Sequence, residues 1–408
     1  MIHRMEIENF YSIRETQVID LRIGAKVPDE EGRFAEIQDG SGVRVPKTVA
    51  FFGANASGKS TVLKALSFLR WFLVLSFQTA PEQSMPLFRF ADGNAEPLKI
   101  KVEFDANEVF HDESPNGPSM ESEMYSYELI VGDIGSRRLV VLSEEFRALP
   151  RRGRSRLLFK RNADGSVKTG MGFSLGKLGM IVGSKLRSNV SLTATIAQFS
   201  EESPLNVLLN WARCLMSNIT ITKWTIDDEA EKGITQMYAE NPELIASLQK
   251  VLNMVDVGIT SIKIAQTENG KDVHFGHGGL SGHIPILLES EGTKQFFYIY
   301  PDIWFVLEFG GVAIVDEMDS TMHPLLLPEI LRWFHNPITN PHQAQLWFSG
   351  HSASLLEELQ KEEVFFAEKD GQGRTTVFGL RDIEGVRRVD NFYQKYLGGV
   401  YGAVPRIG

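Results

Sequence analysis

The sequence is poor in cysteine and has no uninterrupted apolar run of membrane-spanning length. Its 408 residues contain one cysteine, Cys214, which excludes an internal disulfide framework and a cysteine-rich zinc site. The longest apolar region, residues 296–315, contains a proline and two acids, so it predicts a buried helix followed by a buried strand. The first ten residues carry acids where a signal peptide needs an apolar core. We therefore expect a cytoplasmic protein without a membrane partner.

Positive charge is also scarce. The chain has 42 Lys and Arg residues against 52 Asp and Glu residues, a net charge of −10, which argues against broad non-specific nucleic-acid binding. Seven basic residues nevertheless cluster within 147–161, namely Arg147, Arg151, Arg152, Arg154, Arg156, Lys160 and Arg161. This segment fits either a solvated strand and loop or a surface for a phosphate backbone, and both alternatives stay open.

Residues 53–60 have the phosphate-binding pattern of two glycines, a lysine and a hydroxyl residue at fixed spacing. An apolar strand is predicted at 48–52 and an amphipathic helix at 61–69, so the pattern lies between a strand and a helix. Backbone N–H groups and the helix N-terminus favour phosphate, Lys59 reaches the outer phosphates, and Ser60 offers a hydroxyl to Mg²⁺. The residues that we expect to contact ATP here are Gly53, Asn55, Ala56, Ser57, Gly58, Lys59, Ser60 and Thr61.

A second part of the site is predicted where residues 312–315 form a short buried strand that ends in Asp316 and Glu317. Asp316 is placed to hold Mg²⁺, and Glu317 to orient or deprotonate the attacking water. The next predicted strand, 343–348, is followed by His351, which we expect to contact the γ-phosphate and sense hydrolysis. His323 is expected to fix the turn into a helix at 325–334.

Ser290 and Gly292 precede an apolar helix that is predicted to begin near Thr293. Their hydroxyl and backbone N–H groups would lie at a helix N-terminus, which favours phosphate. An ordinary helix cap would give the same pattern.

The remaining chain suggests three regions. Residues 1–171 are expected to form an N-terminal lobe with the phosphate loop and an antiparallel β region, with strands at 5–23, 97–104, 125–131 and 137–149. Residues 24–46 and 105–122 are predicted as loops. Residues 172–258 are expected to form a mainly helical insertion, and 259–408 a C-terminal lobe. No internal repeat or long heptad array is present.

The ordered set of motifs resembles the ATP-binding-cassette (ABC) type ATPase heads of the SMC and RecF group. Within that group it looks most like bacterial AAA ATPases associated with phage defence, the overcoming-lysogenization-defect (OLD) class and the RloA or AbiL-type proteins. Residues 7–13, 290–293, 316–324 and 396–405 carry this likeness. It implies an α/β P-loop NTPase with an ABC-type core, in which a mixed central sheet is joined by an antiparallel β subdomain.

The resemblance further implies that two heads sandwich ATP. Ser290 and Gly292 of one chain would then touch the γ-phosphate held by the other chain's Lys59, and Asp319 would lie in the loop that communicates across the dimer. The sequence departs from transporter ATPases because residues 290–293 lack the double glycine and the adjacent glutamine. Gln78 and Gln83 are the candidates for a metal-contacting glutamine. The chain ends soon after the ATPase core, so a toprim nuclease domain like that of the OLD class is not expected.

These observations together predict an ATPase that requires ATP and Mg²⁺, forms a homodimer or a higher oligomer, and regulates a separate effector, a nuclease or toxin encoded nearby, in anti-phage defence. The alternative is a RecF-like or SMC-like ATPase that acts on DNA in repair or chromosome maintenance. A nucleotide-dependent binding module without hydrolysis is disfavoured, because such a switch does not need the base Glu317.

Overall fold

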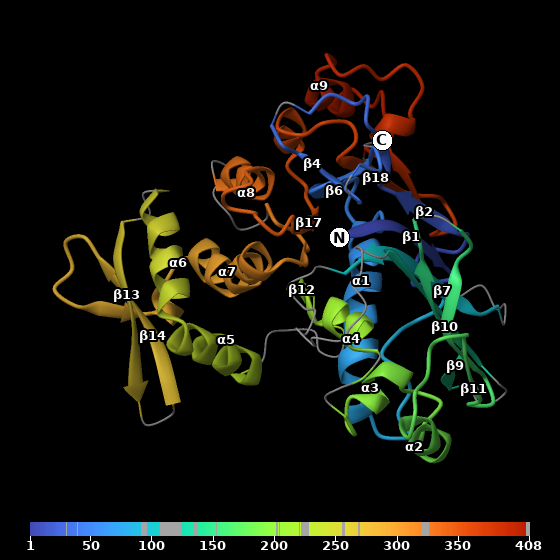
Figure 1. Cartoon of the computed structure of the whole chain (residues 1–408). Coiled ribbons are helices and arrows are strands. Elements are labelled where there is room, and N and C mark those ends of the chain that lie inside the picture. The colour runs from blue at the N-terminus through green and yellow to red at the C-terminus, as the bar shows by residue number, and fades with distance from the viewer. Residues whose placement is uncertain are drawn as a thin grey trace.

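The computed structural model describes residues 1–29, 31–38, 40–90, 96–106, 124–133, 138–151, 153–200, 203, 205–219, 221, 228–254, 258–267, 270–319 and 326–404. Figure 1 shows a central sheet near the chain termini, an antiparallel sheet on one side of the molecule, and a helical and β-hairpin lobe on the other. The predicted loop at 105–122 falls almost entirely outside the described residues.

The central sheet is mixed and six-stranded in the described part of the chain, with the order β12-β16-β17-β6-β18-β19. All neighbouring pairs are parallel except β18 and β19. The strands are β12 (Leu215–Ser217), β16 (Val312–Val315), β17 (Gln345–Ser349), β6 (Thr48–Phe52), β18 (Val364–Lys369) and β19 (Thr375–Gly379). Every residue of β6, β16 and β17 is buried, as expected for central strands covered on both faces. The strand predictions at 48–52, 312–315 and 343–348 are confirmed.

The second sheet is antiparallel, with seven strands among the described residues in the order β11-β10-β9-β8-β7-β1-β2. Its strands are β11 (Val167–Thr169), β10 (Arg156–Asn162), β9 (Leu139–Leu149), β8 (Met124–Asp133), β7 (Leu98–Asp105), β1 (Ile2–Glu8) and β2 (Gln17–Asp20). Burial alternates along β7 and β1, so one face packs on the core. The predicted antiparallel region is therefore confirmed.

The prediction of a loop at 24–46 is wrong. A small sheet lies there, made of β3 (Ile23–Gly24), β5 (Val43–Pro46) and β4 (Phe34–Glu36) in the order β3-β5-β4. Phe34, Ala35 and Val45 are buried, and the Arg44 guanidinium lies 5.4 Å from the centre of the Phe34 ring. These strands have two to four residues each, which is too short for an alternating pattern to stand out from charged neighbours.

Helix α1 (Lys59–Arg70) follows the phosphate loop and continues through a π-helical turn at Trp71–Leu75 and a 3-10 turn at Ser76–Gln78. Its apolar residues Val62, Leu66 and Leu69 are buried, as their spacing predicted. Of the described helices, the segment Lys59–Gln78 has the length and apolar composition to cross a membrane, with 67% of its most apolar stretch buried inside the structure. A core helix of a soluble protein has these same properties.

The expected helical insertion at 172–258 is not one unit. The region holds α2 (Leu178–Lys185), α3 (Leu192–Ile196), α4 (Asn206–Arg213), α5 (Asp228–Glu240) and α6 (Pro242–Met254). It also contributes strand β12 to the central sheet, where Leu215 pairs with Val312. Leu208 and Trp211 of α4 join the core of the antiparallel sheet, whereas Leu244 and Leu248 of α6 join a second core. Tertiary packing divides the region, because its apolar stripes face different partners.

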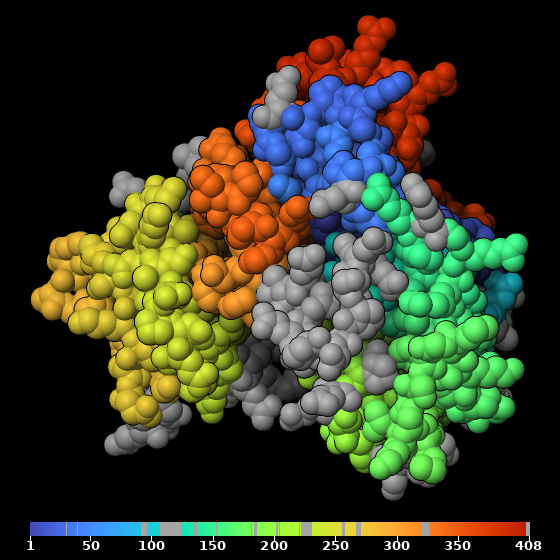
Figure 2. Space-filling model, viewed as in Figure 1, coloured from blue at the N-terminus to red at the C-terminus, as the bar shows by residue number. Residues whose placement is uncertain are grey.

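The second core includes a lobe built from α5, α6 and a three-stranded sheet, β13 (Ile259–Thr267), β14 (Gly270–His277) and β15 (His283–Pro285). Helix α7 (Glu291–Phe309) leads from this lobe to β16, while α8 (Leu326–His335) and α9 (Phe392–Leu397) cover the region around the central sheet. The helix prediction at 325–334 is confirmed. Figure 2 shows residues of this lobe, in yellow, at the side of the molecule opposite to the green antiparallel sheet.

A buried carboxylate fixes the start of β6, the strand that leads into the phosphate loop. Glu363 accepts a hydrogen bond from the Thr48 hydroxyl, pairs with Arg33 at 2.9 Å, and lies 3.2 Å from His335 Nε2. Burial by itself would raise the pKa of Glu363, but the His335 hydrogen bond, the Arg33 charge and the Thr48 hydroxyl outweigh it. The pKa of Glu363 is therefore lower in the folded chain than in the unfolded chain.

This network predicts an acid-sensitive contribution to stability. A carboxylate whose pKa falls on folding stabilises the fold above its unfolded pKa. This stabilisation is lost as the pH falls from the unfolded pKa through the lower folded pKa. Replacing Glu363 by glutamine is expected to lower the free energy of unfolding at neutral pH by about 3 kcal/mol, because Arg33 loses its buried partner. Urea unfolding between pH 7 and 3 measures both effects, because the stabilisation is lost below the ordinary glutamate pKa of 4.5, toward the lower pKa of the folded chain. The exposed Glu384, changed to glutamine, is the control, and equal acid sensitivity of the wild type and Glu363→Gln would contradict the assignment.

Candidate nucleotide site

The phosphate loop lies between β6 and α1, as predicted. Gly53 and Gly58 have φ angles of 148° and 110°, conformations that side chains disfavour. Lys59 Nζ donates to the carbonyl oxygens of Gly53 at 2.9 Å and Ala54 at 3.1 Å. Burial lowers the pKa of Lys59, opposed by the charges of Asp316, Asp319 and Glu317. The lysine is thus held inside the loop, facing a set of carboxylates.

Ser57 and its neighbours form the rest of the loop. Asn55 and Ala56 are exposed, and Ala56 has a φ of 61°. The Ser57 hydroxyl is buried and has no hydrogen-bond partner in the described structure. An orphaned hydroxyl beside the N-terminus of α1 suits a phosphate oxygen, which would satisfy it. The loop therefore fits a nucleotide phosphate group.

Asp316 is brought to the phosphate loop by the strand order. Strands β16 and β6 flank β17, and Asp316 at the end of β16 accepts a hydrogen bond of 2.9 Å from the Ser60 hydroxyl. A hydroxyl and a carboxylate oxygen in contact are the hard ligands that Mg²⁺ takes beside phosphate and water. No cluster of three His, Cys, Asp or Glu side chains suited to a metal occurs among the residues that the structure describes. The pair fits Mg²⁺ carried by a nucleotide.

Two residues at this site were missed by the sequence analysis. The Ser349 hydroxyl, at the end of β17, donates to Asp316 and accepts from the Glu317 backbone N–H at 2.8 Å. The Asn218 side chain accepts from the Asp316 N–H at 2.9 Å and donates to the Asp316 carbonyl at 3.1 Å. Ser349 directly precedes Gly350 and His351, so the predicted strand end pointed to it. Asn218 gave no comparable signal, because strand β12 before it was not predicted.

Glu317 and His351 lie beside each other at the strand ends. Glu317 has a φ of 52°, in the left-handed region, and its side chain is 59% exposed. His351 Nε2 lies 3.8 Å from Glu317 Oε1. The Asp319 carboxylate accepts from the backbone N–H groups of His351, at 2.7 Å, and Ser352. The structure therefore gathers three predicted site residues at one exposed edge, with Asp319 bracing the turn that carries His351.

Ser290 and Gly292 are not brought to the phosphate loop of their own chain. Ser290 is the N-cap of α7, where its hydroxyl accepts from Thr293 N at 3.2 Å and lies 2.8 Å from Thr293 Oγ1. It follows directly from the β13-β14-β15 lobe and is exposed. The cap interpretation is confirmed, and the nucleotide role stays a prediction. His323 lies outside the described residues.

The glutamine candidates lie at the wrong end of the first helix. Gln78 ends the helical segment that begins at Lys59. At 1.5 Å per residue, Gln78 therefore lies roughly 30 Å from Lys59 along the helix. Gln83 lies beyond it, where its side chain accepts from Ala80 N at 3.2 Å. Neither reaches Ser60 in this structure, so both candidates are wrong for this arrangement.

Most of the basic segment is engaged within the chain. Arg147 and Lys160 pair with Glu145, and the buried Arg161 contacts Glu144 at 3.4 Å. The other members are Arg151, Arg154 and Arg156, which are exposed, and Arg152, which is not among the described residues. Arg151 also donates to the Gly40 carbonyl at 2.9 Å. Internal pairing weakens the case for a phosphate-backbone surface here.

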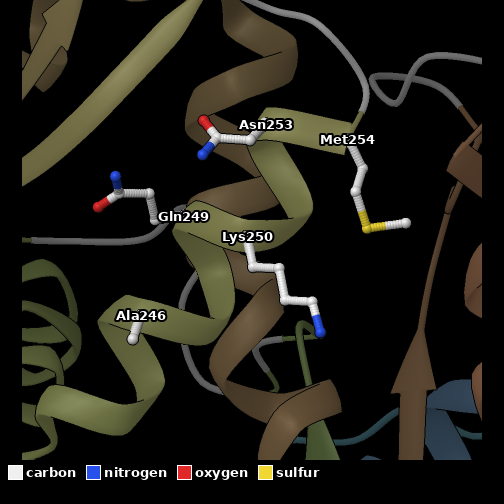
Figure 3. Close-up of a pocket in the computed structure, with 5 residues that line it drawn as sticks. All are labelled: Ala246, Gln249, Lys250, Asn253 and Met254. Atoms are coloured by element: carbon white, nitrogen blue, oxygen red, sulfur yellow. The ribbon is translucent and has the colours of Figure 1, made fainter.

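A shallow pocket lies on helix α6, away from these residues. Figure 3 shows its lining side chains, which are Ala246, Gln249, Lys250, Asn253 and Met254. All five belong to one helix, and the set lacks a carboxylate, a histidine and a phosphate loop. We assign no nucleotide chemistry to it.

Solved structures with detectable similarity include heads of SMC proteins. They include an Smc head bound to the C-winged helix domain of ScpA, with 14% identity, a TM-score of 0.45 and coverage of 93% of this chain and 97% of that chain. The SMC head domain from Thermotoga maritima has 13% identity, a TM-score of 0.37, and coverage of 93% and 98%. An Smc head from Pyrococcus furiosus with an extended coiled coil, bound to the C-terminal domain of ScpA, has 13% identity, a TM-score of 0.38, and coverage of 93% and 96%.

A comparison with curated proteins found no match. A protein-family model described as "AAA domain, putative AbiEii toxin, Type IV TA system" matches residues 49–169 and 187–357, well over half of the chain. The matched residues include the phosphate loop, Asp316, Glu317 and His351. The predicted P-loop NTPase fold, with a mixed central sheet and an antiparallel β region, is therefore confirmed, and the chain belongs to this family of AAA-domain proteins.

Proposed function

We propose that the chain is a Mg²⁺-dependent ATPase that dimerises on ATP and uses hydrolysis to regulate a separate effector, a nuclease or toxin, in bacterial anti-phage defence. The observation that carries the ATPase part is the Ser60–Asp316 hydrogen bond. It joins the hydroxyl of the phosphate loop to the strand-end carboxylate, although 256 positions separate them in the chain. Neighbouring Glu317 completes a set of residues for phosphate binding and water activation.

The residues divide the chemistry between them. Lys59 and the loop N–H groups bind the phosphates, and Ser60 and Asp316 would hold Mg²⁺. When bound, Mg²⁺ would neutralise phosphate charge and polarise the γ-phosphoryl group. Glu317 accepts a proton from the attacking water. His351 Nε2 lies 3.8 Å from the Glu317 carboxylate, where it would orient that carboxylate or contact the γ-phosphate. Ser349 holds both acids in place.

The proposed dimer rests on the separation of Ser290 from its own phosphate loop. Ser290 and Gly292 lie at the exposed N-terminus of α7, a 19-residue helix whose dipole favours an anion there. Glu317 and His351 are also exposed at their edge. A second copy that covers this edge with its α7 N-terminus would complete the site and exclude water from it.

Replacing Ser290 by arginine tests this arrangement. A large cation at the α7 N-terminus is expected to prevent ATP-dependent dimers, while the affinity of the monomer for ATP changes by less than about twofold. Light scattering after gel filtration, with and without ATP, measures the molecular mass of the variant and so distinguishes monomers from dimers. Loss of the N-cap costs about 1 kcal/mol, so thermal unfolding confirms that the variant is folded. The exposed Ser84, changed to arginine, is the control, and ATP-dependent dimers of Ser290→Arg equal to those of the wild type would exclude Ser290 from the interface.

The defence role rests on the family. Its description names the AbiEii toxin and a type IV toxin–antitoxin system, which supports an ATPase coupled to a toxic activity. We expect the effector to be encoded nearby and to co-purify with the ATP-bound protein. Purification with a DNA-repair assembly instead would favour the RecF-like alternative.

A further inference from the structure

Both glycines of the phosphate loop face the hairpin formed by β18 and β19. A Cβ added at Gly53 would lie 2.3 Å from the Ala367 carbonyl oxygen, and one added at Gly58 would lie 2.3 Å from Thr375 Oγ1. These separations are too short for any side chain. The C-terminal hairpin is therefore packed directly against the loop, and its residue Thr375 is 2% exposed.

Thr375 is the centre of a chain of hydroxyl groups that joins four segments. Its Oγ1 lies 2.8 Å from the Ser57 carbonyl oxygen and 2.8 Å from Ser12 Oγ. Ser12 Oγ lies 3.2 Å from Thr61 Oγ1 on α1, and the Thr375 backbone N–H donates to the Ser12 carbonyl at 2.7 Å. The turn between β1 and β2, the loop, α1 and β19 thus share one network.

The Thr375 hydroxyl is the donor to the Ser57 carbonyl oxygen, because a carbonyl oxygen can only accept. It is also placed to donate to Ser12 Oγ, and the hydrogen bond between Ser12 Oγ and Thr61 Oγ1 can run in either direction. Since a hydroxyl has one proton, the Ser57 carbonyl and Ser12 Oγ share the Thr375 proton.

The bond to Ser57 orients the peptide that joins Ser57 to Gly58. In a trans peptide the C=O and N–H groups point in opposite directions, and no cis peptide occurs among the described residues. Holding the Ser57 carbonyl toward Thr375 therefore turns the Gly58 N–H away from β19, toward the inside of the loop. Backbone N–H groups in such loops bind phosphate.

We propose that Thr375 is a positioning residue for nucleotide binding, whose hydroxyl locks the Ser57–Gly58 peptide in the orientation that binds phosphate. Because the hydroxyl contacts the loop and Ser12 and lies outside the Glu317 and His351 edge, its loss weakens ATP binding and leaves the chemical step unchanged. The inference rests on the proposed ATP-binding function and adds the C-terminal hairpin to the nucleotide site.

The test compares Thr375→Val with Thr375→Ser. Valine keeps the shape but not the hydroxyl, whereas serine keeps the hydroxyl. Thr375→Val is expected to raise the dissociation constant for ATP and the KM about tenfold, the scale of one hydrogen bond, with kcat within about twofold of the wild type. Thr375→Ser should bind ATP within about twofold of the wild type. Thr376→Val, on the exposed face of the same strand, is the matched control.

Equilibrium binding of ATP, steady-state hydrolysis and thermal unfolding are measured for each variant. Wild-type affinity in a folded Thr375→Val overturns the proposal, and so does equal weakening by the serine and valine variants, which would assign the effect to the methyl group. If Thr375→Val does not fold, Thr375→Ala removes the same hydroxyl from a smaller side chain and is expected to weaken ATP binding about tenfold; unchanged binding would then overturn the proposal. Absence of ATP binding by the wild type would overturn the proposed function itself.

Discussion

Exchanging Glu317 for glutamine is expected to abolish ATP turnover and leave ATP binding intact. An amide has nearly the same shape as the carboxylate but cannot accept the proton of the attacking water. Losing a general base lowers kcat by about 10²–10⁴-fold. Since the phosphate contacts are made by other residues, the affinity for ATP should be unchanged, and ATP-bound dimers should accumulate.

Phosphate release and gel filtration with ATP measure these outcomes. Glu308, an exposed glutamate near the end of α7, provides the control when changed to glutamine. The Glu317 backbone is held by Ser349 at 2.8 Å, so the variant should keep the local fold. Turnover at the wild-type rate in Glu317→Gln would remove this residue from the mechanism.

Changing Lys59 to alanine is expected to weaken ATP binding by at least about 100-fold. Each charge-assisted hydrogen bond to a phosphate contributes about 1.5–3 kcal/mol, and the lysine reaches both outer phosphates in this type of loop. Its removal also leaves Asp316, Asp319 and Glu317 without the cation that they face, so they repel the nucleotide.

Titration calorimetry with ATP and Mg²⁺ measures this change. Lys64→Ala is the matched control, because Lys64 lies on the same helix but places its ammonium 5.4 Å from the centre of the Tyr11 ring. Loss of binding in both variants would point to disruption of α1, and unchanged binding in Lys59→Ala would refute the assignment of the phosphate loop.

Local sequence signals predicted the elements that carry the phosphate and metal residues. The strand at 48–52, the helix after Lys59 and the strand before Asp316 each have their own periodicity or an uninterrupted apolar run. Such signals depend only on residues close together in the chain, so they can be recognised whatever the arrangement of the strands and helices in the fold. They failed at 24–46, where strands of two to four residues carry no readable period.

Local sequence patterns could not predict contacts between segments that are distant in the chain. Asn218 holds Asp316 because a three-residue strand, β12, joins the edge of the central sheet from a region expected to be helical. Thr375 meets Gly58 because β18 lies beside β6 and β19 beside β18. Each depends on sheet order, which a single sequence does not specify.

The sequence by itself determined that this protein has a phosphate loop, a strand-end pair of acids and a histidine after the next strand, because spacing along the chain defines these motifs. Only the tertiary structure decided that Ser60 meets Asp316, that Ser349 and Asn218 brace the acids, and that Ser290 lies apart from its own phosphate loop. The physical reason is that side-chain contacts depend on the order in which strands pair, and this order is set by the burial of the whole core.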